Sequence, residues 1–242
     1  MEYSEQYRVP FFFGTTKGTI SLSTLVNIML LTSEHQLDEH DAGVPALAEL
    51  GAGWVITQYH ITVNRMPEVE ELVEVGTAAR SYNRFLTYRD YWINDADGNR
   101  LATIEGTWVM MDLETRKLLP IKAEIVNRVG AEEATTVKRF PRIQKIENET
   151  IRAPYRVRYF DIDSNGHVNN AHYFDWMEDS LGAEWLQQHE LVSIDIRYER
   201  EVAYGDETPI AVAELVSETE TRHKIMSGDV VNAEAQMTWR SL

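Results

Sequence analysis

The densest group of chemically active side chains lies in the segment 161–170, Asp-Ile-Asp-Ser-Asn-Gly-His-Val-Asn-Asn, between a strand-like run and a helical pattern. In an extended backbone, side chains at alternate positions point to the same side. Asp163, Asn165 and His167 therefore present a carboxylate, an amide and an imidazole together. They lie beside a helix start, whose free N–H groups favour developing negative charge. This combination suits general acid–base chemistry with a negatively charged intermediate.

Two other interpretations fit the same segment. The spacing Asp-x-Asp-x-Asn-Gly matches the start of an EF-hand calcium loop. The match fails at the twelfth position, where the motif needs a bidentate Glu and this chain has His172, and the preceding run is strand-like. Asp, Ser, Asn and Gly are also ordinary turn formers, and Asn169 or Asn170 would cap the following helix. Taken alone, the segment is compatible with a purely structural loop.

An internal repeat distinguishes between a structural loop and a functional one. The segment 7–12, Tyr-Arg-Val-Pro-Phe-Phe, matches the segment 155–160, Tyr-Arg-Val-Arg-Tyr-Phe, at an offset of 148 residues. At this offset Gly18 corresponds to Gly166, so both copies keep the glycine of a turn. The polar side chains differ between the copies: Asp163 corresponds to Thr15, Asn165 to Lys17 and His167 to Thr19. We therefore expect a functional site in the second copy only.

The elements around this site follow a pattern that occurs twice. Each copy is predicted to begin with a short strand and a core-facing helix, because apolar residues recur at helical spacing over 22–30 and 173–181. Strand-like runs follow at 54–63, 72–81, 86–93 and 101–111, and again at 192–202, 208–216, 222–226 and 230–239. The pattern predicts an α+β fold with antiparallel sheets wrapped around helices.

Charge is distributed unevenly and indicates where the copies are joined. The net charge of −16 argues against general binding to nucleic acid or anionic membranes. Between positions 116 and 158, however, eleven basic residues stand against five acidic ones. Part of this stretch, 131–153, has no clear periodicity. It is predicted to be a basic linker between a first half at 1–130 and a second half at 154–242.

The composition also limits the location and the cofactors. No run approaches the roughly 20 apolar residues of a membrane span, and the first six residues lack the features of a secretory or transit signal. Cysteine is absent, which agrees with a reducing compartment and excludes thiolate metal sites. No Gly-x-Ser-x-Gly motif or complete dinucleotide fingerprint occurs. We expect a cytoplasmic protein without a metal or cofactor.

The segments 163–173, Asp-Ser-Asn-Gly-His-Val-Asn-Asn-Ala-His-Tyr, and 197–201, Arg-Tyr-Glu-Arg-Glu, resemble the two signature segments of acyl-acyl carrier protein thioesterases. The resemblance extends over nearly the whole chain. It implies a tandem hot-dog fold, in which each half wraps a curved antiparallel sheet around a long helix, and a hydrolase that releases fatty acid from acyl carrier protein. Plant members have a Cys where this chain has Val202, so a thiol mechanism is excluded here. The catalytic residues implied are Asp163, Asn165, His167 and Glu201.

These residue types lead to a hypothesis for thioester hydrolysis. Glu201 would orient and deprotonate a water that Asn165 helps to hold. His167, oriented by Asp163, would polarise the thioester carbonyl together with backbone N–H groups at the helix start. Direct attack by a carboxylate, with an anhydride intermediate, stays open. Two other functions also stay open, an acyl-CoA thioesterase and a non-hydrolytic acyl-binding hot-dog protein.

The sequence also suggests where the substrate binds. The acyl chain is predicted to lie in the first half, because the helix there has more apolar surface than one core-facing stripe requires. The tunnel candidates are Leu25, Val26, Met29 and Leu30. An acidic carrier protein is predicted to dock on the basic stretch, with Lys138, Arg139, Arg142 and Lys145 as the candidate contacts. A homodimer is compatible with the sequence.

Overall fold

A computed structural model describes all 242 residues. The first half contains β1 (Glu2–Arg8), α1 (Leu22–Glu39), α2 (Val44–Ala48), β2 (Ala52–Val63), β3 (Leu72–Tyr82), β4 (Thr87–Asn94), β5 (Arg100–Asp112), β6 (Leu118–Leu119), α3 (Ala123–Val126) and β7 (Glu132–Glu133). The second half contains β8 (Ile151–Pro154), α4 (His172–Asp179), α5 (Ala183–Gln188), β9 (His189–Tyr198), β10 (Ile210–Ser217), β11 (Glu220–Ser227) and β12 (Val230–Ser241). Short 3-10 turns occur at Phe11–Phe13, Asn127–Val129 and Tyr159–Asp161.

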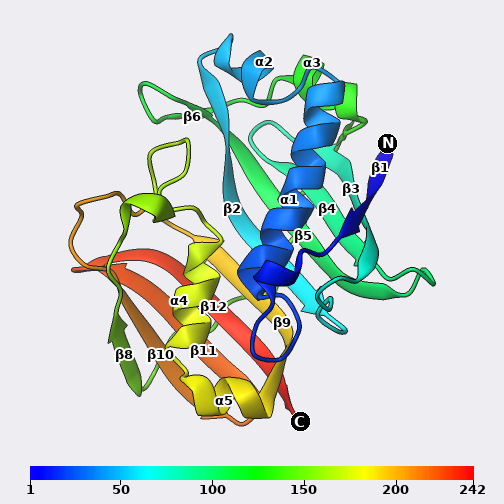
Figure 1. Cartoon of the computed structure of the whole chain (residues 1–242). Coiled ribbons are helices and arrows are strands. Elements are labelled where there is room, and N and C mark those ends of the chain that lie inside the picture. Colours follow the sequence, from blue (N-terminus) through cyan, green and yellow to red (C-terminus); the bar gives the residue numbers. More distant parts are fainter.

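The strands form one sheet, and its two halves have the same strand order. The order is β1-β3-β4-β5-β2 in the first half and β8-β10-β11-β12-β9 in the second, with β6 added beside β5 and β7 beside β3. The halves join where β2 pairs antiparallel with β9, with Tyr59 opposite Ile196 and Thr62 opposite Ser193. Helices α1 and α4 lie on the same side of this sheet, each against the strands of its own half (Figure 1). The predicted α+β class with antiparallel sheet is confirmed.

Helix α1 has the strong start and the apolar face that its sequence predicts. The side chain of Ser21 accepts a hydrogen bond from the N–H of Thr24 at 3.2 Å, which caps the first turn. Leu25, Val26 and Met29 are each 0% exposed and pack into the core. The helix runs for 18 residues before it ends at Glu39, so it covers much of the first-half sheet.

The helix of the second half is shorter than predicted. The apolar spacing over 173–181 predicts one continuous helix, but α4 ends at Asp179 and α5 begins only at Ala183. Gly182 lies between them with φ of +85°, a left-handed conformation that stops an α-helix and is available to glycine at little cost. The expectation of a long helix in each half is therefore wrong for the second half.

The basic stretch between the halves is irregular only in its middle. No helix or strand occurs over 134–150, but β7 precedes this range and β8 follows it. Strand β8 forms the edge of the sheet, with Ile151 opposite Ala213 and Pro154 opposite Ile210. An edge strand tolerates proline because one side of it needs no ladder hydrogen bonds, and this explains why β8 lacks a clear sequence signal.

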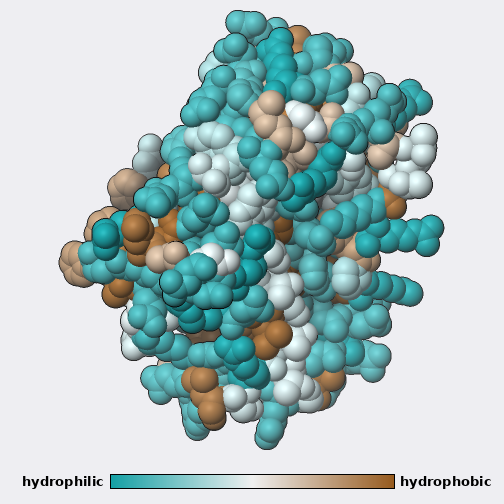
Figure 2. Space-filling model, turned by 90° about the vertical axis from the view of Figure 1, so that its right-hand side faces the viewer, coloured by the Kyte–Doolittle hydropathy of each residue, from teal (hydrophilic) through white to brown (hydrophobic).

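One core joins the two halves. A cluster of 33 buried residues includes Met29 from α1, Phe174 from α4, Ile61 from β2 and Ile196 from β9. A second cluster of 11 residues lies around the end of α1 and includes Leu37 and residues of α3. Figure 2 shows a face of the molecule that is mainly hydrophilic, with hydrophobic residues in small separate groups. None of the helices combines the length and the hydrophobicity that a membrane crossing requires.

The buried imidazole of His223 on β11 should make stability depend on pH. His223 is 1% exposed, and burial lowers its pKa to about 3 from an ordinary value of 6.5. The folded protein keeps it neutral, while the unfolded chain binds a proton below pH 6.5. Its contribution to the free energy of unfolding should therefore fall by up to about 1.4 kcal/mol per pH unit from about pH 6.5 towards pH 3.

Urea unfolding of the wild type and of His223→Gln at several pH values between 7 and 4.5 measures this effect. The free energy of unfolding should fall more steeply with decreasing pH in the wild type than in the variant. The difference between the two slopes should correspond to the uptake of about one more proton on unfolding of the wild type. Equal slopes in the two proteins would contradict the burial argument.

Candidate active site

The segment predicted to do chemistry forms a tight turn that leads into α4. Ile162 and Val168 face each other across a short antiparallel bridge. Within it, the N–H of Asp163 donates to the carbonyl of His167 at 2.9 Å, and the N–H of Gly166 donates to the carbonyl of Asp163 at 3.0 Å. Gly166 has φ of +83°, which favours glycine. The turn is thus a backbone support that fixes the direction of its side chains.

The first half contains the same turn with different side chains. The N–H of Thr15 donates to the carbonyl of Thr19 at 2.8 Å, and the N–H of Gly18 donates to the carbonyl of Thr15 at 3.0 Å. Gly18 has φ of +75°, close to its counterpart in the second half. The prediction that both copies keep a structural glycine turn is confirmed.

Each turn is hydrogen-bonded to a later segment of its own half. Comparing these two bonds identifies the first-half residue that corresponds to Glu201. The equivalent bonds run from Ile20 N–H to the Pro67 carbonyl at 3.0 Å, and from Val168 N–H to the Val202 carbonyl at 2.8 Å. The residue before the acceptor is Met66 in the first half and Glu201 in the second. A thioether therefore occupies the position of the carboxylate in the first half, which has neither the glutamate nor the histidine.

Glu201 and His167 are in contact. The Nε2 atom of His167 lies 3.2 Å from Oε2 of Glu201, and the two side chains are 27% and 39% exposed. The Nδ1 atom of His167 is buried and has no hydrogen-bond partner. Nε2 is thus the nitrogen that faces the carboxylate. Such a pair can take a proton from a water molecule and pass it on.

Backbone contacts from two elements hold the chain around Glu201. The N–H of Val202 donates to the phenol oxygen of Tyr173 on α4 at 3.1 Å. The side-chain amide of Asn232 on β12 donates to the carbonyls of Arg200 and Glu201, at 3.2 Å and 3.4 Å. Burial raises the pKa of Tyr173, so its phenol stays protonated near neutral pH. Glu201 therefore projects from a segment that helix and sheet both position.

Arg116, from the other half, also binds Glu201. Its Nη2 atom donates to both oxygens of the Glu201 carboxylate. Arg116 lies in the turn between β5 and β6 and has φ of +57°. The sequence showed only that this residue begins the basic stretch, because 85 positions separate it from Glu201. A contact between residues so far apart in the sequence leaves no local sequence pattern by which it could be predicted.

The structure places Asp163 and Asn165 near the pair but not on it. Oδ1 of Asp163 accepts the backbone N–H of Asn165 at 2.8 Å, the hydrogen bond of an Asx turn. The side chain of Asn165 is exposed and makes no hydrogen bond within the protein. The expected contact in which Asp163 orients His167 is absent, because the Asp163 carboxylate bonds its own turn.

A residue that the sequence analysis left without a role, Asp161, anchors the start of this turn. It is 2% exposed, and its carboxylate lies 2.6 Å from the guanidinium of Arg158. Burial opposes ionisation, but the hydrogen bonds and charge of Arg158 outweigh it and lower the pKa of Asp161. Its carbonyl accepts the N–H of Asn169, whose side chain accepts the N–H of Ala171 at 2.9 Å. Asn169 thus stabilises the turn just before α4, whose N-cap residue is Ala171.

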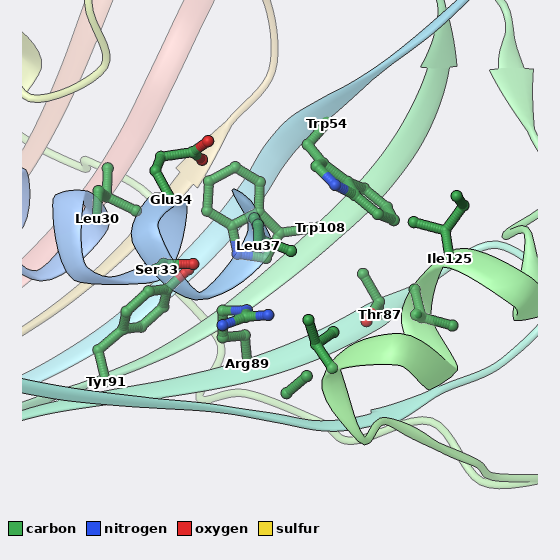
Figure 3. Close-up of a pocket in the computed structure, with 13 residues that line it drawn as sticks. Leu30, Ser33, Glu34, Leu37, Trp54, Thr87, Arg89, Tyr91, Trp108 and Ile125 are labelled. Atoms are coloured by element: carbon green, nitrogen blue, oxygen red, sulfur yellow. The ribbon is translucent and has the colours of Figure 1, made fainter. Parts of the chain in front are cut away.

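A cavity of about 490 Å³, counting the space open to solvent at its mouth, lies in the first half (Figure 3). Nine of its 13 lining residues are hydrophobic, among them Leu30, Leu37, Trp54, Trp108 and Ile125. Of the four tunnel candidates, only Leu30 lines this cavity. The other three, Leu25, Val26 and Met29, belong to the main core.

The basic stretch packs on the strands of the second half. Its backbone is held by hydrogen bonds from Gln144 N–H to Gln236 and from Arg222 to the Lys145 carbonyl, at 3.1 Å and 3.0 Å. The ammonium of Lys138 pairs with Glu105 at 2.7 Å. The side chains of Arg139, Arg142 and Lys145 make no ion pair and are exposed. None of the four docking candidates contacts His167 or Glu201.

Two family models match the chain on either side of this stretch. Residues 1–129 match the acyl-ACP thioesterase N-terminal domain, and residues 144–241 match the acyl-ACP thioesterase C-terminal domain. The chain belongs to the acyl-ACP thioesterase family. The resemblance of the two signature segments is thereby confirmed.

Individual members of this family are similar over different shares of their length. A chloroplastic acyl-[acyl-carrier-protein] hydrolase from Cuphea viscosissima is 32% identical over 61% of this chain and 38% of its own length. A chloroplastic oleoyl-acyl carrier protein thioesterase from Coriandrum sativum is 27% identical over 85% of this chain and 61% of its own length. The chain therefore spans less than two thirds of the length of these relatives.

Solved structures of the family match the whole chain. A Lactobacillus plantarum protein assigned as an oleoyl thioesterase is 42% identical and has a TM-score of 0.96, covering 100% of this chain and 97% of that one. A 12:0-ACP thioesterase from Umbellularia californica is 19% identical, with a TM-score of 0.88 over 100% of this chain and 98% of that one. The second comparison shows a shared fold alone.

The hydrogen bond beneath Glu201 is open to a direct test. Tyr173→Phe leaves the N–H of Val202, a residue that is 0% exposed, without a partner. A buried donor without a partner costs about 1–3 kcal/mol, so the free energy of unfolding should fall by that amount and the Val202 amide should exchange faster with solvent.

The matched control is Tyr155→Phe, whose hydroxyl donates to the carboxylate of Asp179 on the surface. It should leave exchange at Val202 unchanged, as measured by NMR. An unchanged Val202 exchange rate in Tyr173→Phe would mean that this hydrogen bond does not hold the Glu201 segment.

Proposed function

We propose that this protein hydrolyses the thioester of fatty acyl-acyl carrier protein, releasing free fatty acid and terminating fatty acid synthesis. The observation that carries the proposal is the contact between Glu201 and His167 at 3.2 Å. The first half has Thr19 at the position of His167 on its turn and Met66 at the position of Glu201 on the segment bonded to that turn. Membership of the acyl-ACP thioesterase family supports the same reaction. The names of the plant relatives as acyl carrier protein hydrolases and thioesterases agree with it.

In the proposed mechanism, Glu201 acts as the general base for a water molecule. As the water oxygen bonds to the thioester carbon, its proton moves to the carboxylate and the carbonyl oxygen becomes an oxyanion. His167, through Nε2, and the backbone N–H groups before α4 supply hydrogen-bond donors for that charge. When the C–S bond breaks, the sulfur takes the proton, giving fatty acid and the carrier thiol. Asp163 shapes the turn by accepting the N–H of Asn165, and the exposed amide of Asn165 would help to hold the water.

We also propose that each half is one hot-dog unit, with residues 1–130 as the acyl-binding unit and 154–242 as the catalytic unit. The identical strand order in the two halves supports this division, as does the repeated turn before each main helix. Residues 131–153 connect the units. The cytoplasmic location and the homodimer stay predictions from the sequence.

The first-half cavity is our proposed site for the acyl chain. Its apolar lining suits a hydrocarbon, because each buried CH₂ group gains about 0.8 kcal/mol. The cavity and the site are connected through β5, which contributes Trp108 to the lining and ends at the turn that carries Arg116. For carrier-protein docking, Arg139, Arg142 and Lys145 stay the best candidates of the basic stretch, because Lys138 is already paired with Glu105.

Substitution of the catalytic residues tests the reaction itself. Glu201→Gln and His167→Ala should each lower kcat/KM for acyl-acyl carrier protein by a factor of about 100 or more, because each removes one member of the acid–base pair. Asp163→Ala should lower it by a similar factor, because it removes the side-chain hydrogen bond that fixes the turn carrying His167. Free fatty acid is measured by mass spectrometry. The control is Thr19→Ala, the first-half counterpart of His167, which should keep activity within about twofold. Near-normal turnover in two of the three variants would overturn the assignment.

Filling the cavity tests the proposed acyl site. Leu30→Trp and Ile125→Trp should shift the released fatty acids to shorter chains by one or two carbon pairs, because the added side-chain volume displaces buried CH₂ groups. The matched control is Leu31→Trp, at an adjacent position of α1 that is 43% exposed. An unchanged product profile in both cavity variants, with stable folding shown by urea unfolding, would contradict the site.

A further inference from the structure

We infer that Arg116 is a positioning residue for Glu201, so that the first half holds the catalytic carboxylate of the second half. The inference rests on the proposed function, because it assigns Arg116 a role through the proposed general base. Arg116 itself is a donor that stays charged and cannot accept or release a proton in the reaction. Its effect on hydrolysis must therefore pass through the group that it binds.

The contacts of the Glu201 carboxylate show what Arg116 would do. Nη2 of Arg116 donates to both carboxylate oxygens, and Nε2 of His167 lies 3.2 Å from Oε2. No other side chain of the protein bonds this carboxylate. A glutamate side chain has several rotamers, and one that is 39% exposed pays entropy to stay in a single one. Two donors from different elements define one orientation.

The turn that carries Arg116 is built to keep its backbone fixed. The carboxylate of Asp112 accepts the N–H of Glu114 at 3.1 Å, the N–H of Thr115 at 2.7 Å and the hydroxyl of Thr115 at 2.8 Å. The N–H of Arg116 donates to the Asp112 carbonyl at 3.0 Å. The hydrogen bonds from Thr115 lower the pKa of Asp112, so these bonds persist at neutral pH. Four hydrogen bonds thus fix a turn of a few residues.

Arg116 also has φ of +57°, a conformation that non-glycine residues adopt rarely. Such backbone conformations cluster at functional sites. Here the unusual conformation belongs to a residue whose guanidinium reaches Glu201 in the other half of the molecule. Lys117, the next residue, has the same charge and makes no ion pair, so charge alone does not account for the contact.

A role in positioning differs in its consequences from two simpler roles. A residue that docks the carrier protein would act on KM, and only for substrates attached to that protein. A residue that merely ties the halves together would act on stability, with a loss of activity that does not depend on Glu201. A positioning residue acts on kcat, for every thioester, and only while Glu201 can act as a base.

The experiment is a double-mutant cycle with two substrates. The proteins are the wild type, Arg116→Ala, Glu201→Gln and the double variant, each measured for kcat and KM on acyl-acyl carrier protein and on acyl-CoA. Arg116→Ala should lower kcat about 10-fold or more on both substrates and change KM less than about twofold. In the Glu201→Gln background, the same substitution should change kcat by less than about twofold.

Two further variants keep the result interpretable. Lys117→Ala removes a neighbouring charge from the same turn and should leave kcat unchanged. Arg116→Lys keeps the charge, and should recover part of the lost kcat because an ammonium can still donate to one carboxylate oxygen. Urea unfolding of each variant reports any loss of folded protein.

Some outcomes would overturn the inference. These are an effect of Arg116→Ala that is equally large with and without Glu201, a rise in KM confined to acyl-acyl carrier protein, or a kcat loss matched by Lys117→Ala. Full activity of Glu201→Gln would be a different result, because it would overturn the assignment of Glu201 as the general base and with it any role for Arg116 through Glu201. Absence of hydrolysis in the wild type would instead overturn the proposed function.

Discussion

The antiparallel pairing of β2 with β9 determines where the site residues lie. This pairing makes one continuous sheet from two halves and brings the end of β9 close to the strands β2 and β5 of the first half. Glu201 follows β9, and the turn with Arg116 follows β5, so the two side chains meet across the boundary. The shared core of α1, α4, β2 and β9 keeps that boundary closed. Without the pairing, each half would keep its turn but not the complete set of contacts.

The two halves differ in side chains far more than in backbone. Both turns keep the same hydrogen bonds and the same left-handed glycine. The second half has His167 on its turn and Glu201 on the segment bonded to it, whereas the first half has Thr19 and Met66 at these positions. The first half has instead a long helix, an apolar cavity and the arginine that binds the carboxylate. In the proposed function, the second half would therefore supply the acid–base groups and the first half the apolar volume and a fixed charge.

The sequence predicted those features that depend on local pattern. Apolar spacing located α1, alternation located most strands, and the offset of 148 residues identified the paired turns through Gly18 and Gly166. The helix break was missed because the apolar spacing continues beyond Asp179, while the left-handed φ of Gly182 stops the helix.

Contacts between distant parts of the chain had no signal of this kind. Arg116 meets Glu201 through strand pairing, and the Asp163 carboxylate bonds its own backbone because that donor is nearest. The cavity lies nearer the C-terminal end of α1 than the predicted tunnel, because the side chains of Leu25, Val26 and Met29 are buried in the core between the halves. A surplus of apolar residues on a helix does not show which of them face an empty space.

We propose that one active site is assembled from both halves of the molecule. A crystal structure of Glu201→Gln with an uncleaved acyl thioester of phosphopantetheine tests it most directly. The thioester carbon should lie beside residue 201 and Nε2 of His167, with the acyl chain in the first-half cavity beside Leu30 and Trp108. An acyl chain bound within the second half, or a thioester carbon away from His167, would contradict the account.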